Sequence, residues 1–132
     1  MPHIAVDYSA NMETIADIAG LCDVLRLAAV DSGVFPTAGI RVRAFMAHHV
    51  SIADGDSKHG FVDISVRLRA GRTSDEKQRA TQQIFAAAER FLTPVMTHHP
   101  VALSLELRDI DPAYSPQTNT IRDHLDRSKT DV

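Results

Sequence analysis

The 132-residue sequence has little of what marks several large classes of protein. Its one cysteine cannot form an intramolecular disulfide, which fits a reducing compartment, and we expect a cytoplasmic protein. Its apolar stretches are far shorter than the roughly 18–20 residues of a membrane span, and we expect neither a leader nor a membrane partner. A net charge of −3 without a basic run gives no signature of nucleic-acid binding.

Alternation of apolar and polar residues predicts four strands. A hydrophobic content of 44% and a charged content of 23% are typical of one globular domain, here residues 1–132. The clearest strand alternates Val62, Ile64, Val66 and Leu68 with polar residues. The four expected strands lie near residues 2–8, 40–46, 62–69 and 101–108.

Apolar residues three or four positions apart predict two helices. The first is expected to run from Met12 to about Gly33, with N-cap chemistry at residues 9–11. Cys22 falls on its apolar stripe, so we interpret this thiol as a core residue rather than a nucleophile. The second helix is expected after Thr73, the first residue of a capping box, and Pro94 is expected to kink or end it.

The order strand, helix, strand occurs twice, which predicts an α+β fold of two tandem βαβ units. The first unit covers about residues 2–46, a polar linker about 47–60, and the second unit about 61–108. A loop and a short helix are expected over residues 109–132. Each unit should place its two strands parallel. The result is a four-stranded mixed sheet with two helices on one face, and the uncovered face predicts that several copies associate.

Pro2 is the first candidate for chemistry, because removal of Met1 makes it the N-terminal residue. An α-amino group has an ordinary pKa of about 7.7–8.0. Burial beside cations disfavours the protonated amine, which leaves a neutral base near working pH. Position alone favours the simpler interpretation that Pro2 merely follows the start codon, and the motifs further along the chain are what favour a catalytic role.

Short motifs along residues 1–110 carry a family resemblance. Met1-Pro2-His3 opens the chain, residues 35–43 (FPTAGIRVR) lead into the second expected strand, and Ala70-Gly71-Arg72 follows the third. Residues 61–62 and 102–106 also match the pattern of strands in that family. In this order and spacing, the chain resembles the tautomerase superfamily and, within it, the 5-carboxymethyl-2-hydroxymuconate isomerases.

The resemblance implies a homotrimer of βαβ-βαβ subunits that uses no cofactor and no metal. It implies an isomerase that converts 5-carboxymethyl-2-hydroxymuconate to its 2-oxo isomer, in homoprotocatechuate degradation. Carried over to this sequence, Pro2 is the acid–base group and Arg41 and Arg72 bind substrate carboxylates, with Arg43 as a further candidate. Arginine suits this role because its planar guanidinium stays charged and pairs with carboxylates through two hydrogen bonds.

Several roles stay open at this stage. Arg43 equally fits a solvated or inter-subunit ion pair, and we interpret Arg67 and Arg69 as structural. A related tautomerase acting on another enol or unsaturated acid, and a catalytically silent trimer of the same fold, are alternative functions. The apolar wall around Pro2 has four aromatic candidates: Phe35, Phe45, Phe61 and Tyr114.

Two adjacent histidine pairs, His48-His49 and His98-His99, are interpreted as loop residues. Neighbours on an extended segment point to opposite faces, and known zinc sites use other spacings. Residues 54–56 (DGD) resemble the start of a calcium loop but lack its twelve-residue pattern. No glycine-rich phosphate-binding motif occurs. The sequence therefore predicts no metal site and no nucleotide.

Overall fold

A computed structural model describes residues 2–125 of the chain. Its strands and helices occur in the order β1 (His3–Ser9), α1 (Ile18–Asp31), β2 (Arg41–Ala47), β3 (Gly60–Arg69), α2 (Ser74–His98) and β4 (Val101–Ile110). Short 3-10 helices lie at Ala10–Thr14, Thr37–Gly39, Pro112–Tyr114 and Ile121–His124. The repeated strand–helix–strand order is thus confirmed.

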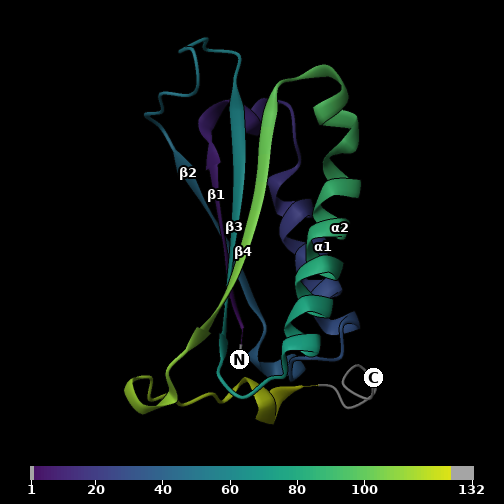
Figure 1. The fold of residues 1–132 in the computed structure, drawn as a ribbon, viewed down its shortest axis with the longest axis vertical. Coiled ribbons are helices and arrows are strands. Elements are labelled where there is room, and N and C mark those ends of the chain that lie inside the picture. The colour runs from purple at the N-terminus through teal and green to yellow at the C-terminus, as the bar shows by residue number, and fades with distance from the viewer. Residues whose placement is uncertain (1, 126–132) are drawn as a thin grey trace.

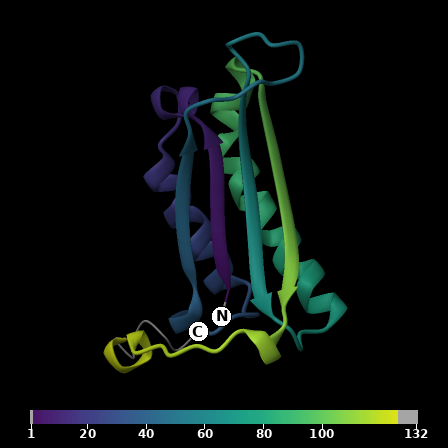
Figure 2. The ribbon, with the colours of Figure 1, turned by 90° about the vertical axis from the view of Figure 1, so that its left-hand side faces the viewer.

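The strands form one four-stranded sheet in the order β2-β1-β3-β4. β1 pairs parallel with β2, and β3 pairs parallel with β4, as two βαβ units require. The two units meet where β1 and β3 pair antiparallel. Both helices lie against one face of the sheet, and the other face is open (Figures 1 and 2). This arrangement confirms the predicted mixed sheet.

The core lies between the sheet and the two helices. Successive side chains of a strand point to opposite faces, so Ile4, Val6 and Tyr8 of β1 face the helices and are buried. The residues that pair with them across β3 are buried too, and both helices add an apolar stripe. Each large aliphatic side chain that is fully buried here contributes about 1.5–3 kcal/mol. The largest fully buried residues include Leu21, Leu25, Val62, Ile64, Val66, Leu68, Ile84 and Leu92.

α1 begins at Ile18, so the predicted start at Met12 is wrong. The Ser9 hydroxyl does not cap a helix; it donates to Asn11 Oδ1 at 2.6 Å and accepts from the Phe61 N–H at 3.0 Å. The chain instead makes a 3-10 turn that buries Met12. Asp17 then caps α1 by accepting from the Gly20 N–H at 2.9 Å.

The capping box of α2 is confirmed, because Thr73 Oγ1 accepts from the Glu76 N–H and Glu76 Oε1 accepts from the Thr73 N–H. Pro94 does not end the helix, which continues to His98. Pro94 leaves the Arg90 carbonyl without its helical donor. Both residues are exposed, so this carbonyl lies on the solvent side of α2 and the helix tolerates the proline.

After β4 the chain crosses beneath the sheet, past the start of β1 (Figure 2). Asn119 Nδ2 donates to the Ala38 carbonyl at 2.9 Å and fixes this segment to the connector between α1 and β2. The short helix expected within residues 109–132 is a 3-10 helix at Ile121–His124. The rest of the predicted C-terminal region, residues 126–132, lies outside the described residues.

Candidate active site

Pro2 lies directly before β1, a central strand of the sheet. Its side chain is fully buried, and its carbonyl accepts a hydrogen bond from the Arg41 backbone N–H at 3.3 Å. The sheet therefore holds Pro2 from its neighbouring strand. A group carried by a regular element in this way keeps a better defined position than one on a loop.

Arg41 opens β2 and pairs in register with His3. Its Nη2 lies 3.4 Å from His3 Nε2, and its Nε is buried without a hydrogen-bond partner among the described residues. A buried donor without a partner is uncommon and costs free energy. The structure thus brings Arg41 beside Pro2 with donor capacity that the described chain does not use.

His3 and Arg67 are the residues of this region that sequence reasoning missed. His3 pairs with Arg41 on β2 and with Arg67 on β3, so the three side chains share the open face of the sheet. Burial, and then the charges of Arg41, Arg67 and Arg43, lower the pKa of His3. His3 is therefore neutral near pH 7, and its Nε2 accepts from Arg41. The alternation of each strand indicates which face His3 and Arg67 occupy. Only the register between the strands shows that the two residues are neighbours.

Arg43 lies two residues beyond Arg41 on the same face and pairs with Ala5. Its guanidinium carbon lies 5.9 Å from the centre of the Phe45 ring, a cation–π contact. Strand geometry advances about 3.3 Å per residue, so Arg43 is roughly 7 Å further along the sheet from Pro2 than Arg41 is. The structure does not bring Arg43 into contact with Pro2.

Arg72 follows β3 and lies at the same end of the sheet as Pro2, because β3 runs antiparallel to β1. Gly71, with φ +121°, forms the turn that places it there. Arg72 Nε donates to the Val34 carbonyl at 3.4 Å, and Nη1 donates to the Arg69 carbonyl at 3.2 Å. Arg72 thereby connects the turn after β3 to the connector after α1.

The aromatic candidates separate by position. Phe35 is buried in the connector beside Val34, at the Pro2 end. Phe45 pairs with Asp7, and Phe61 lies at the start of β3, so within one protomer both are toward the other end of the sheet. Tyr114 is 86% exposed and forms no wall within one protomer. Phe35 is the buried aromatic candidate at the Pro2 end.

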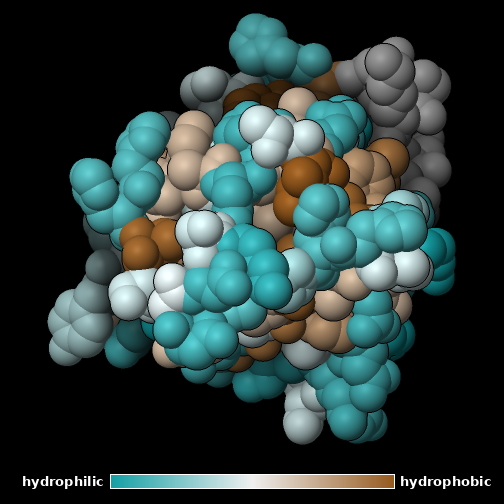
Figure 3. Space-filling model, turned by 90° about the horizontal axis from the view of Figure 1, so that it is seen from above, coloured by the Kyte–Doolittle hydropathy of each residue, from teal (hydrophilic) through white to brown (hydrophobic). Residues whose placement is uncertain are grey.

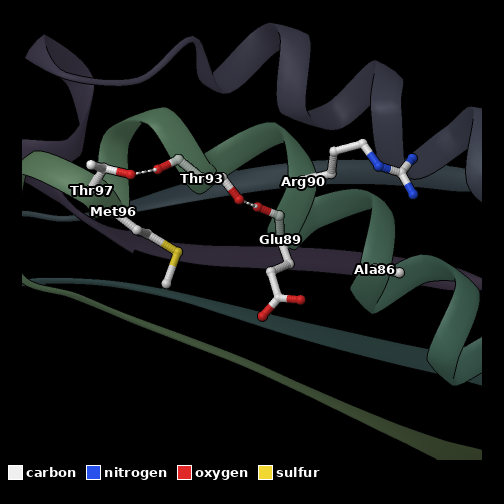
Figure 4. Close-up of a pocket in the computed structure, with 6 residues that line it drawn as sticks. All are labelled: Ala86, Glu89, Arg90, Thr93, Met96 and Thr97. Carbon is white, nitrogen blue, oxygen red and sulfur yellow. Dashed lines mark hydrogen bonds between the residues drawn. The ribbon is translucent and has the colours of Figure 1, made fainter.

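The opposite end of the molecule has a different surface. Seen from above, it is covered mostly by hydrophilic side chains, with apolar ones in separate small patches (Figure 3). A shallow groove of about 500 Å³ lies on the C-terminal half of α2 and is lined by Glu89, Arg90 and Met96 among others. There the Thr93 and Thr97 hydroxyls donate to helix carbonyls of α2 itself (Figure 4). This groove brings together no acid–base pair.

The histidine and acidic motifs have structural partners of their own. His59 Nε2 lies 2.7 Å from Asp54 Oδ1 in the loop between β2 and β3. The hydrogen bond from the Asp56 N–H, and then this contact, lower the pKa of Asp54. Within residues 2–125, no three His, Cys, Asp or Glu side chains lie close enough together to hold a metal ion. Cys22 is half-buried, and burial raises the pKa of its thiol. No helix in the described part of the chain is long and apolar enough to cross a membrane.

Comparison with solved structures identifies the fold. A structure described as a "Q0 fused 4-OT wild type symmetric trimer" superimposes with a TM-score of 0.60 at 22% identity, over 89% of this chain and 92% of that one. At this identity the likeness concerns the fold alone. The tandem βαβ sheet is the tautomerase fold.

The particular family follows from sequence. Residues 2–125 match the family model of 5-carboxymethyl-2-hydroxymuconate isomerase. A 5-carboxymethyl-2-hydroxymuconate Delta-isomerase of Escherichia coli is 29% identical over 121 residues, 92% of this chain and 96% of that protein. A crystal structure of a 5-carboxymethyl-2-hydroxymuconate delta-isomerase is 30% identical, with a TM-score of 0.85 over 94% of this chain and 92% of that one. This chain belongs to the 5-carboxymethyl-2-hydroxymuconate isomerase family, a family of enzymes.

Proposed function

We propose that this protein converts 5-carboxymethyl-2-hydroxymuconate to its 2-oxo isomer, with the amine of Pro2 as the acid–base group once Met1 is removed. The family and the name of the Escherichia coli relative support the substrate. The observation that carries the mechanism is the position of Pro2, held by Arg41 at the start of a central strand beside cationic side chains. We place this activity in cytoplasmic homoprotocatechuate degradation.

The proposed step moves one proton. The neutral Pro2 nitrogen accepts the 2-hydroxyl proton, and the O–H electron pair forms the C2=O bond. The diene electrons shift, and the same proton is returned to a distant carbon of the former diene. One O–H bond breaks and one C–H bond forms, so the step needs no oxidant, reductant or covalent intermediate. A placed general base of this kind contributes about 10²–10⁴-fold in rate.

The arginines supply binding and electrostatic stabilisation. Arg41 and Arg72 lie at the Pro2 end and are proposed to bind substrate carboxylates through their guanidinium groups. A cation beside the developing 2-oxo oxygen stabilises the negative charge that builds there in the transition state. Arg43, further along the open face, is available to the distal part of an extended substrate.

We also propose that the protein is a trimer. The open face of the sheet carries exposed Phe45, and the related fused 4-OT structure is described as a symmetric trimer. Among the described residues no helix covers this face, so a second copy of the chain can cover it. Sedimentation at micromolar concentration should give the trimer mass, and a stable monomer would contradict the proposal.

The test follows the ultraviolet absorbance of 5-carboxymethyl-2-hydroxymuconate with protein whose intact mass shows that Met1 is absent. Rapid loss of the dienol band, lowered about 10²-fold or more in Pro2→Ala, supports the proposal. Pro100→Ala is the matched control, because Pro100 is exposed and lies before β4 at the opposite end of the sheet. No acceleration over buffer would favour a relative with another substrate or a silent trimer.

A further inference from the structure

Three basic side chains lie in one row across three neighbouring strands. His3 of β1 lies between Arg41 of β2 and Arg67 of β3, each in direct register with it. All three project from the open face of the sheet, because the alternate residues Ile4, Val42 and Val66 form the buried face. The row is the first register step after Pro2, the proposed base.

The charge of this row is not balanced within the described part of the chain. None of the ion pairs among residues 2–125 includes Arg41 or Arg67. Two acidic residues of β1 and β3 lie on this face, Asp7 and Asp63. They lie opposite each other in the strand register, four residues beyond His3 along β1. That is a distance of about 13 Å at the rise of a strand. Glu106 of β4 also lies on this face, two residues from the position opposite Arg67, and it is paired with Arg108 at 3.9 Å. The row therefore presents two guanidinium groups that have no ion-pair partner among the described residues.

Two further observations favour an anion at this row. The Nε of Arg41 is buried and has no hydrogen-bond partner among the described residues. His3 is neutral, because burial and the charges of Arg41, Arg67 and Arg43 lower its pKa, so its ring separates the two cations without adding charge. Two strand spacings of about 4.8 Å separate β2 from β3, a gap over which two arginine side chains can converge.

We infer that Arg67, with Arg41 and His3, forms a subsite on the open sheet face for a second carboxylate of the substrate. The inference rests on the proposed function, because it assumes that the reacting enol lies at Pro2. A substrate whose enol is at Pro2 then extends a second carboxylate across the strands to Arg67, which lies on β3 directly opposite His3. Arg67 is a specificity residue: it distinguishes enols with several carboxylates from enols with one.

The experiment compares Arg67→Met with Arg108→Met. Methionine keeps an apolar stem of similar length while removing the charge. Arg108 of β4 is the matched control because it lies directly opposite Arg67 in the strand register. Unlike Arg67, Arg108 already has an ion-pair partner, Glu106, at 3.9 Å. Each variant is assayed with 5-carboxymethyl-2-hydroxymuconate, with 2-hydroxymuconate, which has two carboxylates, and with 2-hydroxypenta-2,4-dienoate, which has one. Calorimetry with the unreactive propane-1,2,3-tricarboxylate measures binding independently of turnover.

The subsite predicts that Arg67→Met raises KM for the two larger enols about tenfold or more, with kcat nearly unchanged. KM for the one-carboxylate enol should not change, and Arg108→Met should resemble the wild type. Affinity for the tricarboxylate should fall in parallel. An equal increase in KM for all three enols, or for both variants, would show that the overall positive charge of the sheet face is responsible. That result would overturn the inference.

The calorimetric measurement separates this inference from the proposed function. If no enol is isomerised but Arg67→Met weakens tricarboxylate binding, the subsite stands and the proposed reaction is wrong. If isomerisation proceeds and Arg67→Met leaves both KM and tricarboxylate affinity unchanged, the reaction stands and the subsite is wrong. Sedimentation of the same variant gives a third result: dissociated subunits with unchanged tricarboxylate affinity would assign Arg67 to a carboxylate of a second copy.

Discussion

β1 begins after Pro2 and β3 begins with Gly60, and both residues lie where a βαβ unit starts. At the first start, Pro2 has a buried ring, and its carbonyl bonds to β2. At the second start, the Gly60 N–H donates to the Pro100 carbonyl at 2.9 Å and the Phe61 N–H donates to Ser9 Oγ at 3.0 Å. An amide inside the chain has no basicity, so only the first unit can supply an amine.

The start of β3 is tightly packed, whereas the start of β1 is surrounded by charged side chains. A Cβ on Gly60 would meet Met12 Sδ at 3.0 Å, Ser9 Oγ at 3.1 Å and Asn11 Oδ1 at 3.2 Å. Asn11 Nδ2 also donates to the His59 carbonyl at 2.8 Å. The two units therefore share a backbone arrangement but differ in role. The Pro2 end of the sheet is proposed to bind and convert the substrate, and the Gly60 end packs the two units together.

The largest expected effect comes from converting the Pro2 amine to an amide. Insertion of a glutamate between Met1 and Pro2 prevents trimming and leaves every side chain of the sheet in place. We expect kcat for the dienol to fall by about 10²–10⁴-fold, because a neutral amine no longer exists to accept the proton. Intact mass and thermal unfolding serve as controls for the terminus and the fold. Retained activity would remove Pro2 from the mechanism.

Arg72→Ala tests the arginine that comes from the second unit. We expect KM to rise about 10–100-fold with a smaller change in kcat, because a charged hydrogen bond to a carboxylate is lost. Arg79→Ala is the matched control, since Arg79 Nη2 donates to the Ser32 carbonyl at 3.4 Å as Arg72 Nε does to that of Val34. If both variants raise KM equally, Arg72 acts by holding the connector and not by binding substrate.

Gly60→Ala tests the closed end of the sheet. The added methyl group would press on Met12 and on the Ser9 and Asn11 oxygens, so we expect a loss of about 1–3 kcal/mol in the free energy of unfolding. Urea unfolding gives that loss, and kcat/KM per folded protein should stay at the wild-type value. A fall in kcat/KM without a loss of stability would show that this end takes part in catalysis.

Much of the fold could be predicted because strands and helices have different periods. The alternation in β3 and the capping box of Thr73 and Glu76 are local signals, and the structure confirms both. The start of α1, in contrast, depends on a contact between residues far apart in the sequence. Ser9 reads as a helix N-cap, but its hydroxyl bonds to the Phe61 N–H, 52 positions away in the chain. A distant backbone partner of this kind overrides a local capping preference and leaves no trace in a short window.

The candidate site was predictable in part for the same reason. The motifs around Pro2, Arg41 and Arg72 stand out in the sequence, and their strands place all three at one end of the sheet. His3 and Arg67 became neighbours only through the antiparallel register of β1 and β3. The loop of residues 48–59 precedes β3 and does not fix that register, so the sequence offered Arg67 only as one arginine of an exposed strand face.

The smallest expected effect concerns His3 and the pH dependence of stability. The pKa of His3 in the folded protein is lowered from its ordinary value of 6.5 by burial and by Arg41, Arg67 and Arg43. The folded state thus binds fewer protons than the unfolded state between the lowered pKa and 6.5. The stability that neutral His3 contributes is complete above that window and is lost as the pH falls through the folded pKa. Urea unfolding at pH 8 and pH 5 should therefore show a smaller decrease in stability for His3→Gln than for the wild type. An equal decrease in stability for both proteins would mean that burial and the neighbouring arginines do not lower the pKa of His3. The stability of the Pro2 end would then depend on pH no more than that of the Gly60 end.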